Sequence, residues 1–142
     1  MCFDRALRVL RPGIARHGGR LVKVEADSLM LAFPDARSAC RGVFAMEQAL
    51  RRLNRGRPTN EQLAFSYGIG FGQVLDLEDD VFGLEVNLAS KLGEDLARAG
   101  EVLLTSSAAE SLPASLRRRL APYGQVAFAG NPMSVQRLRP RP

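Results

Sequence analysis

The stretch LVKVEADSLMLAF, residues 21–33, decides the fold. Apolar and polar side chains alternate over its first half, with Lys23 and Glu25 on one face, which is the pattern of a strand. SLMLAF is more uniformly apolar and predicts a second strand, so the residues EADS between them predict a tight hairpin turn. Asp27 is therefore expected at an exposed turn at the end of a sheet, and Glu25 is expected to face solvent.

The remaining patterns predict an α+β fold. Helices are expected at 3–16, 35–54, 84–98 and 106–113, and loops at 56–62 and 78–83. Strands are expected at 20–26, 28–34 and 101–105, with two weak strands within 120–138. Residues 63–77 are expected to form a strand that bends at its glycines and continues into a partner. This order is typical of a ferredoxin-like, split-βαβ sheet with helices on one face. Such a fold opens with a strand before its first helix, and the sequence leaves no room for one, so the first strand is expected to be missing.

Length and composition predict one domain over residues 1–142. Hydrophobic residues make up 46% of the chain and charged residues 25%, which is ordinary for a globular protein. No stretch approaches the ~18 apolar residues of a membrane span, and the charged N-terminal segment argues against a secretory signal, so we expect a cytoplasmic protein without a membrane partner. Cys2, Cys40 and the single histidine, His17, match neither a disulfide framework nor a zinc site, and both cysteines are expected to be plain thiols.

The net charge of +5 comes from arginine-rich segments such as LRRLNRGR and SLRRRL. They could bind nucleic acid or a phosphorylated ligand, but arginine-rich helix faces are more often simply solvated. FSYGIGF could indicate an RNA-binding sheet, yet the basic residue that opens such a motif is absent. GIGFG looks like a phosphate loop, but it leads into a strand and not into a helix N-terminus. We therefore expect no nucleic-acid partner.

Four stretches line up, in order and spacing, with one family: HGGRLVKVEADSLMLAF, YGIGFGQV, DDVFGLEVNLASKL and AGEVLLT. Over roughly residues 5–112 the chain resembles the catalytic domain of class III adenylate and guanylate cyclases. The resemblance implies a homodimer with active sites built from both chains, which converts ATP to cyclic AMP and pyrophosphate in intracellular signalling. It also implies Mg²⁺ or Mn²⁺ as cofactors, in a mechanism with two metal ions held by two aspartates.

The resemblance implies roles for three residues in binding. Asp27 matches the second metal aspartate, and a hard cation needs oxygen ligands at a rigid, exposed strand end. Lys23 and Asp80 match the residues that recognise adenine. A cation and a carboxylate can contact its acceptor nitrogen and its exocyclic amine, whereas guanine offers a carbonyl at that edge, so the pair favours ATP. Without the resemblance, Lys23 and Asp80 are two surface charges or a pair with each other.

Two further residues match catalytic positions of the family. Asn87 matches the asparagine that orients the ribose, and Lys91 stands where the family has an arginine that stabilises the transition-state charge on the phosphates. They lie at i and i+4, hence on one helix face. Lysine keeps the positive charge but loses the planar fork of arginine. A milder departure is Ala26, where the family usually has glycine.

The largest departure from the family is the missing first strand, which carries the other metal aspartate. Asp4 lies on the first predicted helix and cannot replace it, and one carboxylate cannot hold two divalent ions. We therefore expect either that the chain is a fragment of a longer protein or that a neighbouring segment or a partner chain fills the gap. Activity of this chain by itself is left open. The alternative is a catalytically inactive cyclase-like domain for nucleotide sensing or partner regulation.

Overall fold

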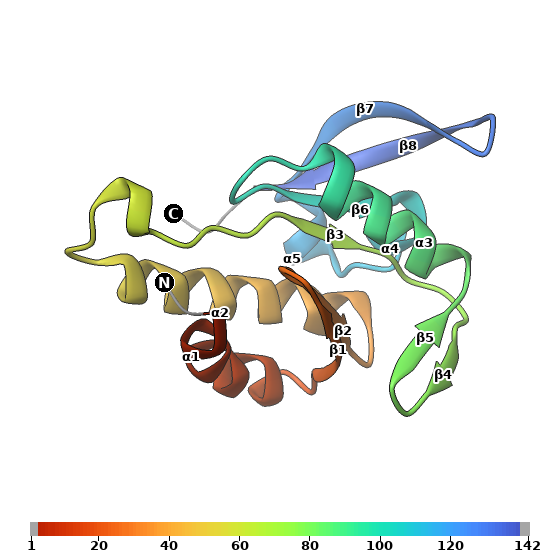
Figure 1. The fold of residues 1–142 in the computed structure, drawn as a ribbon. Coiled ribbons are helices and arrows are strands. Elements are labelled where there is room, and N and C mark those ends of the chain that lie inside the picture. The colour runs from red at the N-terminus through yellow and green to blue at the C-terminus, as the bar shows by residue number, and fades with distance from the viewer. Residues whose placement is uncertain (1–2, 140–142) are drawn as a thin grey trace.

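The computed structural model describes residues 3–139, and its helices and strands follow an α+β order (Figure 1). The elements are α1 (Phe3–Arg16), β1 (Arg20–Glu25), β2 (Ser28–Ala32), α2 (Ala36–Asn54), η1 (Thr59–Glu61), β3 (Tyr67–Ile69), β4 (Leu75–Leu77), β5 (Asp80–Phe82), α3 (Leu84–Lys91), the π turn η2 (Leu92–Leu96), β6 (Val102–Thr105), α4 (Ser106–Glu110), α5 (Ala114–Arg117), β7 (Leu120–Phe128) and β8 (Asn131–Leu138). The predicted α+β class is confirmed.

The strands form three separate sheets. A four-stranded sheet has the order β3-β6-β8-β7, in which β3 is parallel to β6 and the other pairs are antiparallel. The hairpin β1–β2 and the hairpin β4–β5 are each a two-stranded sheet of their own. Within residues 3–139 no strand precedes α1, and β3 lies at the edge of its sheet.

Helices cover both faces of the four-stranded sheet, whereas the sequence predicted one covered face. Alternate residues of β3 and β6, such as Ile69 and Leu104, join the larger core with α1, α2, α4 and α5. Leu103 points the other way and forms a smaller cluster with Leu92 of η2 and Val135 of β8. Figure 1 shows α2 on one side of β3 and α3 on the other.

The hairpin β1–β2 has the predicted form. Glu25 pairs with Ser28, so the turn consists of Ala26 and Asp27 alone. Ala26 has a φ of +51°, the left-handed region in which a glycine is least strained. The ends of the helices also follow the sequence signals: Gly18, with a φ of +77°, follows α1, and the Asp35 carboxylate caps α2 by accepting a hydrogen bond from Ser38 N at 2.7 Å.

Five predicted elements differ from the structure. The break at the glycines of residues 63–77 is present, but the two sides are separate strands: β3 ends before the glycine-rich segment 70–72, and β4 pairs with β5 in another sheet. The expected loop 78–83 contains β5, and the expected helix 84–98 leaves α-helical geometry after Lys91, where the π turn begins. The two C-terminal strands are not weak: they are nine and eight residues long, and β8 lies inside the main sheet.

Cys40 lies fully buried in the larger core, and burial raises the pKa of its thiol to about 12. At neutral pH it is therefore a protonated, apolar-like side chain. Cys2, the other predicted thiol, lies outside the described residues. Among the helices of residues 3–139, none combines the length and the apolar composition needed to cross a membrane.

Candidate functional site

Two of the sequence-predicted residues meet although 57 positions separate them. Lys23 projects from β1, and its Nζ lies 3.1 Å from both carboxylate oxygens of Asp80, the first residue of β5. Asp80 also accepts a hydrogen bond from Val81 N at 2.8 Å, which fixes the carboxylate at the start of the strand. Both side chains stay partly exposed, so a bound molecule can reach them.

A third charge belongs to this pair. The Oε1 of Glu25 lies 2.7 Å from Lys23 Nζ, so the lysine sits between two carboxylates. Hydrogen bonds to Glu25 and to Asp80 raise the pKa of Lys23, and the hydrogen bond from Lys23 lowers the pKa of Asp80. Glu25 was predicted to face solvent only. Its exposure is confirmed, but it also holds the ammonium in place.

A second ion pair fixes the β4–β5 hairpin against β1. Arg20 pairs with Asp76 of β4, and its Nη1 donates a hydrogen bond to the Glu78 backbone oxygen at 3.1 Å. The hairpin thus contacts β1 near its own turn, where Asp76 and Glu78 meet Arg20 and Asp80 meets Lys23. This contact explains how Asp80, predicted on a loop, reaches the β1 lysine.

Asp27 lies at the tip of the β1–β2 hairpin and is exposed, as predicted. Asn87 and Lys91 lie on α3 one helical turn apart, Asn87 exposed and Lys91 half-buried. Within residues 3–139 no hydrogen bond or ion pair joins Asn87, Lys91 or Asp27 to the Lys23–Asp80 pair. One chain therefore brings together the two predicted adenine-binding residues, but it does not link them to the other three.

No family model matches the chain. It is 36% identical over 114 residues to the adenylate cyclase of Streptomyces coelicolor, covering 80% of this chain and 27% of that protein. It is 30% identical over 105 residues to the putative adenylate cyclase 3 of Rhizobium meliloti, covering 74% of this chain and 18% of that protein. The chain thus spans well under half of the length of these curated relatives.

Solved structures of cyclases share the fold. The adenylate/guanylate cyclase/hydrolase of Silicibacter pomeroyi matches with a TM-score of 0.82 at 23% identity, covering 98% of this chain and 83% of that one. An adenylate cyclase of Trypanosoma brucei matches with a TM-score of 0.74 at 22% identity, covering 96% and 76%. The chain is a class III nucleotidyl cyclase domain. The resemblance seen in the sequence is confirmed.

Cyclase domains usually use divalent metals, but the residues of this cyclase domain do not fit a metal centre by themselves. No group of three or more His, Cys, Asp or Glu side chains that could hold an ion occurs within residues 3–139. Asp27 stands at an exposed turn without a second carboxylate, and Glu25, the nearest one along the chain, is engaged by Lys23. A divalent ion needs several oxygen ligands. The described residues of one chain therefore do not supply the ligands that a divalent ion requires.

Sequence reasoning missed Glu85, in the first turn of α3. Its Oε1 accepts one hydrogen bond from Phe71 N at 2.9 Å and another from Thr105 Oγ1 at 2.6 Å. The available signal was the alternation of glycines in GIGFG. Glycine at every second position of an extended segment indicates that another backbone approaches one of its faces.

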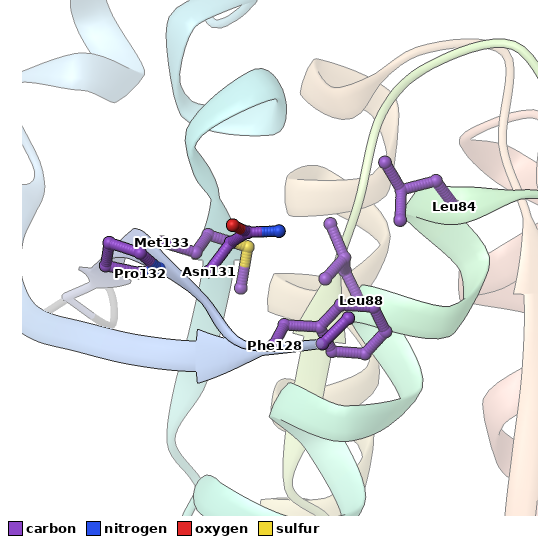
Figure 2. A pocket seen from close by; sticks show the side chains of 7 residues that line it. Leu84, Leu88, Phe128, Asn131, Pro132 and Met133 are labelled. Carbon is purple, nitrogen blue, oxygen red and sulfur yellow. The ribbon is translucent and has the colours of Figure 1, made fainter.

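A shallow apolar pocket of about 220 Å³ lies between the start of α3 and the turn that joins β7 to β8. It is lined by Leu84, Leu88, Phe128, Ala129, Asn131, Pro132 and Met133. Figure 2 shows Phe128 of β7 beside Leu88 of α3, with Met133 and Asn131 on the opposite wall. No charged side chain lines the pocket, so it does not suit a phosphate group.

Proposed function

We propose that this cyclase domain, as one domain over residues 1–142, binds ATP in preference to GTP at a site shared by two copies of the chain. The observation that carries the proposal is the Lys23–Asp80 contact. The fold and the relatives support a nucleotide ligand, and the pair supports adenine as its base. Formation of cyclic AMP and pyrophosphate is the reaction that this site would serve once a complete metal centre is present.

The chemistry of the pair favours adenine over guanine. An ammonium group only donates hydrogen bonds, and an ionised carboxylate only accepts them. Lys23 can therefore donate to a ring nitrogen while Asp80 accepts from the exocyclic amine of adenine. Guanine presents a carbonyl oxygen at that edge, which would face the Asp80 carboxylate without a proton between them. Binding of guanine would leave polar groups of the site without hydrogen-bond partners, and this cost lowers its affinity relative to adenine.

Asn87 and Lys91 would contact the sugar and the phosphates. Asn87 is exposed on α3 and carries both a donor and an acceptor, which suits a ribose hydroxyl. Lys91, one turn later, can neutralise phosphate charge as a compact point charge, although it lacks the two-pronged geometry of arginine. Both side chains lie on one face of the helix, as binding to one nucleotide requires.

A site shared by two chains is supported by the exposed apolar surface near these residues. Leu75, Leu77 and Phe82 lie on one face of the β4–β5 hairpin, since Leu75 pairs directly with Phe82, and all three are exposed. Adjacent exposed apolar side chains of this kind mark interaction surfaces. Light scattering should show a dimer at high concentration with ATP, and a strict monomer under these conditions would contradict the shared site.

Nucleotide preference tests the proposal directly. Calorimetric titration with ATP and with GTP, in the presence of Mn²⁺, should show tighter binding of ATP. Asp80→Asn and Lys23→Met should each reduce the preference about tenfold, because a lost charged hydrogen bond costs about 1.5 kcal/mol. Asp79→Asn is the matched control, since it removes the exposed carboxylate next in the chain. Equal affinity for the two nucleotides, or a preference for GTP, would refute the adenine assignment.

The reaction itself requires more carboxylates than Asp27 provides. Two-metal chemistry needs both ions in place, so we expect the 142-residue chain to form little or no cyclic AMP from ATP and Mn²⁺. A family-type strand with its aspartate, added before α1, should restore turnover, and Asp27→Ala in that longer protein should abolish it. High activity of the short chain that Asp27→Ala does not change would instead disprove the metal assignment.

The rival proposal, a cyclase-like domain that only senses nucleotide or regulates a partner, is favoured by the incomplete donor set around Asp27. The two proposals differ in the longer protein. Nucleotide binding without turnover after the added strand would support the sensing role.

A further inference from the structure

The segment Gly68–Gly72 lies against α3 and η2 with no room for side chains on that face. A Cβ atom at Gly68 would stand 2.0 Å from the Ala89 backbone oxygen, and one at Gly70 would stand 2.5 Å from the Glu85 backbone oxygen. At Gly72 it would stand 2.9 Å from Glu85 Cγ. The first turn of α3 therefore packs directly on the backbone of the segment that follows β3.

Glu85 joins this segment to a third element. Its Oε1 accepts from Phe71 N and from the hydroxyl of Thr105, the last residue of β6, which is 1% exposed. The same hydroxyl oxygen accepts from Ala108 N at 3.1 Å and so caps α4. One carboxylate oxygen thus connects the start of α3, the glycine segment and the end of β6.

No side-chain cap fixes the start of α3. Its N-cap residue is Gly83, which has no side chain to cap the helix. A glutamate in a first turn also favours the helix dipole, but that effect acts through charge and needs no particular partner. The two bonds of Glu85 go to other elements, so they fix where the helix lies and how it is rotated about its axis.

We propose that Glu85 is a positioning residue that sets the orientation of α3 and thereby places Asn87 and Lys91. Asn87 lies two residues after Glu85 and Lys91 lies six residues after it, on the same helix. The placement of these two side chains can be tested without a ligand. Its contribution to nucleotide binding rests on the proposed function. A displacement of a binding group by about 1 Å is enough to weaken a site markedly.

Nuclear magnetic resonance of the nucleotide-free protein tests the positioning. Glu85→Ala should shift the amide signal of Phe71, the side-chain amide signals of Asn87 and the backbone amide of Lys91. Glu85→Gln should leave all three near their original values, because the amide oxygen of glutamine can accept both bonds while the charge is lost. Glu94→Ala, which removes an exposed carboxylate on the following turn, is the matched control. The proposal would be overturned if the Asn87 and Lys91 signals did not change in Glu85→Ala. It would also be overturned if Glu85→Gln shifted these signals as much as Glu85→Ala does.

A binding cycle then tests the consequence for nucleotide. Glu85→Ala should weaken ATP binding about tenfold, Glu85→Gln should restore it, and Glu85→Ala should have no further effect in a protein that already carries Asn87→Ala and Lys91→Ala. If Glu85→Ala lowered the affinity for ATP by the same factor in the protein that carries Asn87→Ala and Lys91→Ala, Glu85 would act elsewhere, and the positioning role would be overturned. If the unmutated domain bound no ATP, the proposed function would fail, while the nucleotide-free spectra would still decide the role of Glu85.

Discussion

The two faces of the four-stranded sheet are packed in different ways. Toward α1 and α2 the sheet buries large side chains, among them Leu104, which belongs to one extensive core with Leu10 and Met46. Toward α3 the contact is made by backbone, with Gly68 against Ala89 and a small cluster around Leu103. One face therefore supplies most of the hydrophobic stabilisation, whereas the other fixes the position of the helix that carries Asn87 and Lys91.

The largest effect is expected on the backbone-packed face. Gly68→Ala places a methyl group 2.0 Å from the Ala89 oxygen, and neither backbone can move without displacing α3. We expect it to lower the free energy of unfolding by about 5 kcal/mol, at the upper end of single-residue effects. Urea denaturation of the variant measures this loss.

Gly56→Ala is the matched control for Gly68→Ala. Gly56 has a φ of +77°, and a methyl group at this position would have no atom within 4 Å, so alanine there should cost only about 1 kcal/mol of backbone strain. A loss for Gly68→Ala no larger than for Gly56→Ala would remove the distinction between the two faces.

The side-chain-packed face should respond to volume. Leu104→Ala removes a fully buried side chain, and we expect a loss of about 3 kcal/mol in the free energy of unfolding. Leu104→Met nearly conserves volume and should cost less than about 1.5 kcal/mol. Thermal and urea unfolding of both variants check this, and equal losses would mean that volume does not govern this face.

The cap of α2, the helix that packs on this side-chain-packed face, should have a smaller and pH-dependent effect on stability. Asp35→Ala removes the cap of α2 and should cost about 1 kcal/mol at neutral pH. Hydrogen bonds from Ser38, chiefly from its backbone N–H, lower the pKa of Asp35. The ionised cap therefore stabilises the fold above the unfolded pKa of about 3.9, and this contribution is lost as pH falls through the lower folded value. Denaturation curves across the acid range measure it, and Asp35→Asn, which caps without titrating, should not show this acid loss.

The smallest effect is expected at Glu47 of α2, which accepts a hydrogen bond from the buried Tyr67 hydroxyl at 2.5 Å. Burial raises the pKa of Glu47, and the bond from Tyr67 offsets this only in part. The protonated form thus favours folding, so this contribution is present below the unfolded pKa of about 4.3 and is lost as pH rises through the folded value. Glu47→Gln should gain stability relative to the unmutated domain between acid and neutral pH. A constant difference in denaturation curves across this range would contradict the assignment.

Much of the fold could be predicted because its patterns are local. The hairpin at Asp27, the helices α1 and α2 and the strand β6 all follow from periodicity and from turn residues. The β4–β5 hairpin was missed because its second strand is only three residues long and follows directly on the acidic residues Glu78 and Asp79, which normally indicate a loop. Contacts with β1, distant in sequence, stabilise that hairpin.

The candidate site was predictable only in part, for a similar reason. Lys23 and Asp80 were selected by resemblance, since no local pattern tells which charges meet across 57 residues. The roles of Asp27, Asn87 and Lys91 stay predictions. The alternating glycines of GIGFG indicate that another backbone approaches, but they do not identify Glu85 itself, because its partners Phe71 and Thr105 lie on other elements.

The π turn Leu92–Leu96 bears on how chains of this family should be aligned. Ala97 N donates to the Leu92 oxygen at 2.8 Å, five residues back, so the turn accommodates one residue more than an α-helix. Deletion of one residue here would return the turn to α-helical geometry and leave α3 itself unchanged. The same gap placed within α3 would rotate everything beyond it by about 100° and separate Asn87 from Lys91 on the helix surface. A single-residue gap between related sequences in this region therefore belongs at 92–96.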